Sequence, residues 1–168
     1  MSIIEKTKSE ITFSKDEFII SKTDLKGKIT YCNELFIEVS QYNEDELLGA
    51  PHSLLRHPDM PSVIFAHLWS ELQLGHEVFA YVKNRNKLGK FYWVLAFVTP
   101  SFNEKGELFE YFSVRRVPAS QDIIETIDSL YSKLLLEEKR AGLSASQALL
   151  NKILEDKGVS YEEFIFSF

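Results

Sequence analysis

Residues 23–61 read TDLKGKITYCNELFIEVSQYNEDELLGAPHSLLRHPDMP, and this stretch decides the fold. Its first part has the pattern of a β-hairpin, because the turn residues KGK at 26–28 lead into the apolar segment ITYC at 29–32. Asn33 follows at once, and asparagine is a favoured N-cap residue. We therefore expect two antiparallel strands that lead directly into a short helix, NELFIEVS.

The rest of the stretch predicts a second helical turn and then a rigid loop. Asn43 and Glu46 have the spacing of a capping box, and Gly49 is a residue type that ends helices. The loop RHPDMP at 56–61 contains two prolines, each of which fixes φ at about −65° and removes a backbone donor. The residues before them are driven toward extended conformations. We expect a stiff, non-helical loop that serves either as a ligand wall or as a rigid connector.

The following segments predict one helix and three strands. The segment PSVIFAHLWSELQL at 61–74 repeats its apolar side chains at helical spacing. Apolar or alternating segments bounded by turn residues predict strands over 77–86, 91–102 and 108–117. Together with strands over 18–25 and 29–32, they define an α+β fold class: a five-stranded antiparallel sheet with short helices inserted between strands two and three.

The pattern changes after Pro118. Four aliphatic residues step by four, three and four positions, which predicts a helical seam too short to indicate a coiled coil; they are Ile123, Ile127, Leu130 and Leu134. Gly142 breaks this helix, and a second helix is expected over 144–157. The chain end is aromatic and is expected to dock on a surface; its rings are Tyr161, Phe164, Phe166 and Phe168.

These patterns divide the chain into three parts. We expect an N-terminal extension over 1–17, a central domain over 18–118, and a C-terminal helical extension with an aromatic tail over 119–168.

Composition excludes several classes of protein. The 168 residues are 45% hydrophobic, enough for a sizeable core, and the net charge of −6 argues against nucleic acid as the main partner. The single cysteine, Cys32, excludes an internal disulfide framework. No apolar segment approaches the roughly 20 residues of a membrane span, and the first residues do not resemble a signal peptide. We expect a cytoplasmic protein without direct membrane insertion.

The order of elements and several separated motifs resemble the PAS domain of bacterial aerotaxis receptors. The resemblance rests on the stretch 23–61, on LW at 68–69, on VKNRNKLGKFYWV at 82–94 and on YFSVRR at 111–116. It implies a PAS fold that binds FAD noncovalently and senses redox or energy state. The chain also resembles the stand-alone PAS proteins of bipartite energy-taxis systems, which implies a separate transducer or other signalling protein as partner, and a homodimer is expected.

The resemblance implies that Arg56, His57 and Asp59 are important for FAD binding. Arginine suits a pyrophosphate through its forked donors, and histidine can donate or accept beside a flavin. Asp59 has two open interpretations. It could accept from a ribose hydroxyl, or it could cap the helix that begins near Pro61.

Three further residues complete the expected cofactor-binding set. Trp69 is either a core residue or, as the resemblance implies, an aromatic wall for the cofactor. Asn84 could face the pyrimidine edge of a flavin, although periodicity alone does not decide which of residues 83–85 points inward. Asn33 is the third residue that we expect at the cofactor. Phe91 and Trp93 are expected in the sheet core or at an interface rather than at the cofactor.

Other functions compete with flavin sensing. The histidines His52, His67 and His76 permit a haem-binding or other small-ligand sensor. A cofactor-free PAS module used for interaction or dimerisation is a second alternative. Cys32 lies at a strand end and lacks the motif of light-sensing relatives that form a flavin–cysteinyl adduct. No catalytic constellation or metal-ligand motif is visible, so we expect neither an enzyme nor a metal site.

Overall fold

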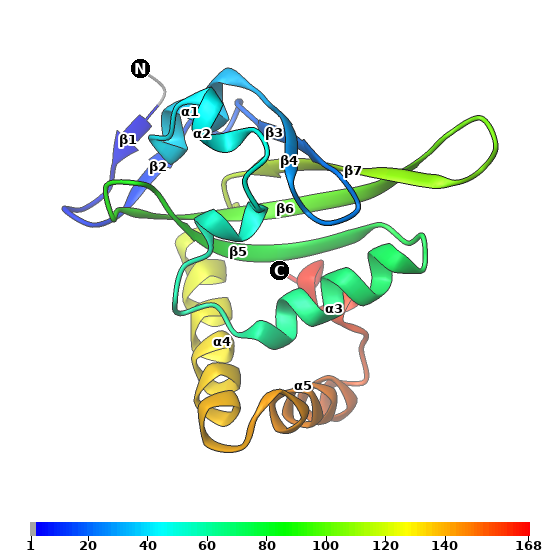
Figure 1. The fold of residues 1–168 in the computed structure, drawn as a ribbon. Helices are drawn as coiled ribbons and strands as arrows, with labels where there is room; N and C mark the ends of the chain where they lie inside the picture. The colour runs from blue at the N-terminus through cyan, green and yellow to red at the C-terminus, as the bar shows by residue number, and fades with distance from the viewer. Residues whose placement is uncertain (1–2) are drawn as a thin grey trace.

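The computed structural model describes residues 3–168, and its centre is a five-stranded antiparallel sheet (Figure 1). The strand order is β4-β3-β7-β6-β5, so the first hairpin lies at one edge and the strand that follows the helices lies at the other. The bounds of the five strands are β3 Ile19–Thr23, β4 Ile29–Cys32, β5 Val78–Arg85, β6 Phe91–Phe102 and β7 Leu108–Arg116.

Short helices connect β4 to β5, as expected from the sequence. They are α1 Glu34–Ser40, α2 Glu44–Leu47, the 3₁₀ helix η1 His52–Leu55 and α3 Ser62–Gln73. The Asn33 side chain accepts from the N–H of Phe36 and so caps α1, and Asn43 and Glu46 form the predicted capping box of α2. In Figure 1, α3 runs alongside β5, and residues of α3 also contact β6.

Strand alternation gives the sheet two different faces. On β5, Val82 and Asn84 point to the face covered by α3, whereas Lys83 points to the opposite face. Asn84 pairs with Tyr92 and Lys83 pairs with Trp93 in the β5–β6 register, so the same alternation continues on β6. The inner face therefore meets the inserted helices, and the outer face at β5 and β6 meets the C-terminal helices.

The C-terminal extension forms three helices, α4 Gln121–Ala141, α5 Leu143–Lys157 and α6 Tyr161–Ile165. Gly142 lies between α4 and α5, and Gly158 ends α5 in a left-handed conformation, as the sequence predicts. Trp93 is buried under α4, with its ring 6.1 Å from that of Tyr131. This confirms its expected place in the core.

The aromatic tail lies on the outer face of the same sheet. Phe166 makes an edge-to-face contact with Phe79 of β5, with ring centroids 4.6 Å apart. Phe79 in turn stacks on Phe97 of β6, and Phe168 lies edge-on to Tyr81. The expectation that the tail docks on a surface is confirmed, and the surface belongs to its own chain.

One small sheet was not expected. Strands β1 Ile3–Glu5 and β2 Ile11–Phe13 pair antiparallel within the N-terminal extension. Ile11 and Phe13 are buried, and the N–H of Phe91 donates to the carbonyl of Ser9, so this hairpin packs at the start of β6.

No helix within residues 3–168 combines the length and the apolar content needed to cross a bilayer.

Candidate functional site

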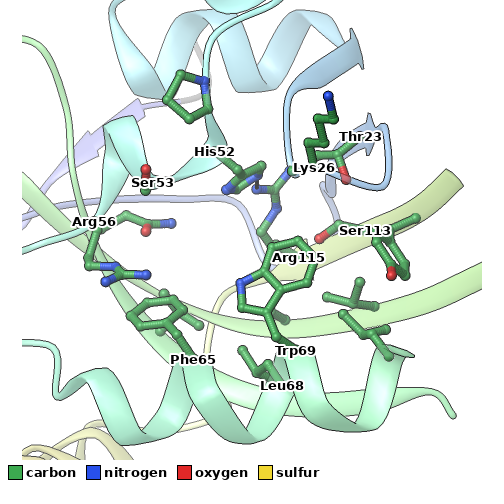
Figure 2. Close-up of a pocket in the computed structure, with 18 residues that line it drawn as sticks. Thr23, Lys26, His52, Ser53, Arg56, Phe65, Leu68, Trp69, Ser113 and Arg115 are labelled. Carbon is green, nitrogen blue, oxygen red and sulfur yellow. Dashed lines mark hydrogen bonds between the residues drawn. The ribbon is translucent and has the colours of Figure 1, made fainter. Parts of the chain in front are cut away.

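A cavity of about 360 Å³ lies between the inner face of the sheet and α3 (Figure 2). Its walls are mostly apolar, and they come from β3, β5, β6, β7, η1, α3 and the turn before β4. Pockets that hold small molecules and cofactors typically have this size range and this mixture of apolar walls and few polar groups. Its polar and charged lining residues are Thr23, Lys26, His52, Ser53, Arg56, Asn84, Ser113 and Arg115.

Trp69 forms an aromatic wall of the cavity. Its ring lies edge-on to that of Tyr111 with centroids 5.4 Å apart, and both residues line the cavity. Gly27 also lies close to the indole. A Cβ at Gly27 would be 3.1 Å from an indole carbon, and its φ of +78° already disfavours any other residue. The position of Trp69 therefore depends on a glycine in the β3–β4 turn.

The most unusual group in the cavity is Arg115 of β7. Its side chain is 2% exposed, and it donates to His52 Nε2 at 2.6 Å and to Ser21 Oγ at 2.5 Å. Its Nε atom is buried without a hydrogen-bond partner, and no carboxylate in residues 3–168 lies within ion-pair distance of it. Buried arginines are normally paired with an anion. Arg115 therefore leaves an uncompensated positive charge at the cavity (Figure 2).

The contact with Arg115 fixes the state of His52. Because a guanidinium only donates, His52 Nε2 must accept, and the imidazole is neutral. Burial, with the charge of Arg115 acting in the same direction, lowers the pKa of His52 to about 3. Burial also lowers the pKa of Arg115 to about 10, so the guanidinium keeps its charge at neutral pH. The pair is one cation and one neutral ring.

Arg56 supplies a second cation to the cavity wall. Its guanidinium lies 3.7 Å from the centre of the Phe65 ring, and its Nε is buried without a hydrogen-bond partner among the described residues. The backbone of Arg56 pairs with that of Asn84, which joins the loop to the edge strand β5. In Figure 2 the Arg56 and Phe65 side chains stack at one end of the cavity, and His52 and Arg115 approach each other nearer its middle.

Asn84 is the one of residues 83–85 that lines the cavity, which answers the question that periodicity left open. It is 4% exposed. Its neighbour Lys83 points the other way, with its ammonium 4.7 Å from the Phe91 ring and 2.9 Å from Asp59 Oδ2. Arg56, Trp69 and Asn84 are thus the three sequence-predicted site residues that the structure brings together.

The other three predicted residues do not line this cavity. His57 Nδ1 accepts from the N–H of Asp59 at 3.1 Å, and Asp59 binds Lys83 on the outer side of β5. Lys83 also holds the pKa of Asp59 below its usual value. Asn33 accepts from the N–H groups of Phe36 and Ile20. A cofactor role for these three stays a prediction.

The alternative role of Asp59, as the cap of α3, is wrong. No side chain of the preceding loop caps that helix. The N–H of Ser62 instead donates to Glu138 Oε1 of α4 at 3.2 Å.

Sequence reasoning missed Arg115 and Ser113 as site residues and assigned His52 only to a haem alternative. One signal could have found Arg115. Tyr111, Ser113 and Arg115 alternate in YFSVRR, so a strand that turns its tyrosine and serine inward also turns this arginine inward.

The histidines are not grouped as metal or haem ligands. His67 and His76 lie outside the cavity and pair with Glu162 and Glu71. His52 lines it, but its Nε2 is held by Arg115. Within residues 3–168, no cluster of three or more His, Cys, Asp or Glu side chains could hold a metal ion.

Known proteins place this chain in a family. The family model described as the PAS fold matches residues 17–116. The aerotaxis receptor of Escherichia coli (strain K12) is 39% identical over 128 residues, which are 76% of this chain and 25% of the receptor. A nitrogen fixation regulatory protein of Klebsiella pneumoniae is 28% identical over 134 residues, which are 80% of this chain and 25% of that protein. The chain thus spans about a quarter of the length of these two relatives.

Solved structures agree on the fold. The light-state structure of the blue-light photoreceptor Aureochrome1 LOV superposes with a TM-score of 0.57 at 23% identity, covering 76% of this chain and 93% of that one. At this identity the likeness concerns the fold alone. The family assignment follows from the match of the family model over residues 17–116, from the five-stranded sheet with inserted helices and from the aerotaxis-receptor relative. The chain therefore belongs to the PAS family.

Proposed function

We propose that this chain is a cytoplasmic sensor that holds FAD noncovalently and reports redox or energy state to a signalling partner. One observation carries the proposal: a mostly apolar cavity is lined by Arg115, a buried guanidinium with no ion-pair partner in residues 3–168, and by partly buried Arg56, whose Nε has no hydrogen-bond partner among those residues. A ligand with an aromatic body and anionic groups satisfies such a cavity. FAD is such a molecule.

Each lining residue has a defined role in this proposal. Trp69 and the apolar walls would contact the flavin rings, and the Asn84 amide would pair with the ring edge, whose N–H and carbonyls match an amide. Arg56, at one end of the cavity, would bind the pyrophosphate. Arg115, oriented by neutral His52 and by Ser21, would face the ring or its substituents with its unsatisfied donor.

The kind of signal is proposed from the relatives. The E. coli relative is an aerotaxis receptor, which supports energy or redox taxis as the biological role. Bound FAD would supply a reversible change of charge and protonation on its rings. The residues that contact those rings then differ in their hydrogen bonds between the two states, which a two-state sensor requires. A transducer as the partner, and a homodimer as the assembly, are part of the same proposal.

The visible spectrum of the purified protein tests the cofactor assignment. We expect flavin absorbance, and we expect FAD rather than FMN or riboflavin after the cofactor is released and identified. The Arg56→Ala and Trp69→Ala variants are expected to carry less FAD. A Soret band would indicate haem instead, and a protein that stays colourless after incubation with FAD would contradict the proposal.

A further inference from the structure

Glu138 of α4 joins the C-terminal extension to the cavity wall. Its Oε1 accepts from the N–H of Ser62 at 3.2 Å, across 76 positions in sequence. Ser62 is the first residue of α3, the helix that carries Phe65 and Trp69 into the cavity. The start of this ligand-facing helix is therefore held by a side chain that lies outside the central domain.

The same carboxylate lies in the electrostatic field of Arg56. Glu138 Oε2 and Arg56 Nε are both buried without a hydrogen-bond partner in the part of the chain that the structure describes. Burial lowers the pKa of Arg56, and the negative charge of Glu138 acts in the opposite direction. A buried charge that lacks direct partners depends on the nearest opposite charge. For Arg56, the carboxylate whose charge acts on it is Glu138. Both side chains lie at the first turn of α3, because Arg56 stacks on the Phe65 ring at 3.7 Å and Glu138 accepts from the N–H of Ser62 at 3.2 Å.

Two more contacts fix the middle of α4 against the cavity strand β5. The Tyr131 hydroxyl donates to the carbonyl of Tyr81 at 2.7 Å, and Asp128 lies 3.9 Å from the ammonium of Lys83. Helix α4 therefore contacts β5 next to Val82 and Asn84, and it contacts the loop and α3 through Glu138. A change in the interactions of Arg56 can therefore reach α4 through Glu138 and through β5.

We propose that Glu138 and the anionic part of a bound ligand compete for Arg56, so that α4 is held less tightly when the cavity is filled. One guanidinium serves two negative groups, and the two groups repel each other. Because linkage is reciprocal, a ligand that weakens the attraction between Arg56 and Glu138 is itself bound more weakly in the presence of the Glu138 carboxylate. The inference rests on the proposed function in one respect, which is that the anion is the pyrophosphate of FAD.

Titrations with FAD and with riboflavin, which lacks phosphate, test the competition in the full chain. Glu138→Gln keeps an oxygen that can accept from Ser62 but removes the charge. We expect this variant to bind FAD about five-fold more tightly than the wild type, at the lower end of ordinary coupling, and to bind riboflavin equally. Glu137→Gln is the matched control, because Glu137 is the adjacent residue of α4 and pairs with Arg140. It is expected to match the wild type.

Equal or weaker FAD binding by Glu138→Gln, or the same gain for riboflavin, would overturn the inference. A double-mutant cycle without ligand separates this failure from failure of the proposed function. Arg56→Gln and Glu138→Gln together are expected to change the unfolding equilibrium constant at least two-fold less than the product of the single changes. Independent effects overturn the inference whether or not flavin binds. If the wild type binds neither flavin but the cycle shows coupling, the proposed function fails and the electrostatic interaction between Arg56 and Glu138 stands.

Discussion

Arg115 Nη1 donates to Nε2 of His52 at 2.6 Å, and this contact joins the last strand of the sheet to the helical insertion 63 positions earlier. The histidine can accept only while it is neutral, so the pair keeps the full positive charge on Arg115. No carboxylate neutralises that charge within residues 3–168. Arg115 also donates to Ser21 and lies 4.8 Å from the centre of the Phe36 ring, but none of these contacts supplies a negative charge, so we propose that the cation serves ligand binding.

Arg115→Gln is expected to weaken FAD binding about ten- to hundred-fold, because a charged hydrogen bond contributes about 1.5–3 kcal/mol. The apo protein is expected to be as stable as the wild type or more stable, since an unpaired buried charge is removed. Flavin titration and thermal unfolding measure the two effects. Arg116→Gln, at the exposed neighbouring position, serves as the control. Loss of stability with unchanged binding would assign Arg115 to structure rather than to ligand recognition.

His52 predicts a specific pH dependence of stability. The folded protein keeps His52 neutral down to a pKa of about 3, whereas the reference value is 6.5. The unfolded chain binds more protons between these values, so the free energy of unfolding falls as the pH falls below about 6.5, by at most about 1.4 kcal/mol per pH unit from this residue.

His52→Gln isolates that contribution, because glutamine can accept from Arg115 and does not titrate. Urea unfolding at about pH 7 and pH 5 is expected to show a shallower loss of stability in the variant than in the wild type. Asp59, whose pKa is lowered by Lys83, contributes with the same sign in both proteins and cancels in the comparison. Identical slopes would show that His52 is not held neutral.

Gly27→Ala is expected to weaken flavin binding by displacing Trp69. The new Cβ would lie 3.1 Å from the indole, at a position whose φ is +78°. Gly89→Ala is a matched control, because Gly89 has a φ of +82° and a Cβ there would meet no atom within 4 Å, so the variant carries the same backbone strain without the contact. Both variants are expected to lose about 1 kcal/mol of stability from strain. Only Gly27→Ala should lose flavin affinity, and equal affinities would argue against Trp69 as a cofactor wall.

Asp59→Asn separates the two roles considered for this loop residue. Asp59 pairs with Lys83, whose side chain is only 10% exposed, whereas Asp59 itself is 57% exposed. We expect a stability loss of about 1 kcal/mol or less because solvent screens the pair. FAD affinity is expected to stay within about two-fold of the wild type, given that the residue lies outside the cavity. A large loss of affinity with unchanged stability would instead support the cofactor role that the family resemblance implies.

Local sequence patterns predicted most of the fold, because capping residues, turn residues and apolar periodicity determine where helices and strands begin and end. β6 has the expected bounds, since turn residues flank its apolar segment on both sides, and Asn33 caps α1 as its residue type predicts. The hairpin of β1 and β2 was missed because its strands have three residues each and no strong turn signal.

The sequence predicted a site residue only where its type and its place in a motif were enough to identify it. Arg56, Trp69 and Asn84 line the cavity, as the motifs indicated. The Arg115–His52 contact and the Ser62–Glu138 contact depend on how distant elements pack, and no local pattern encodes that packing. His57 and Asp59 show the same limit, because their loop borders the cavity while their side chains turn to the outer side of β5.

Hydrogen exchange of the full chain with and without FAD tests the central claim most directly. We predict that FAD slows exchange in the segments that line the cavity, around Arg56, around Trp69 and over 113–115 of β7. The open groove between α4 and α5, lined by Leu130 and Ile153, is expected to show no such protection. Absence of FAD binding, or protection confined to that groove, would contradict the assignment of this cavity as the flavin site.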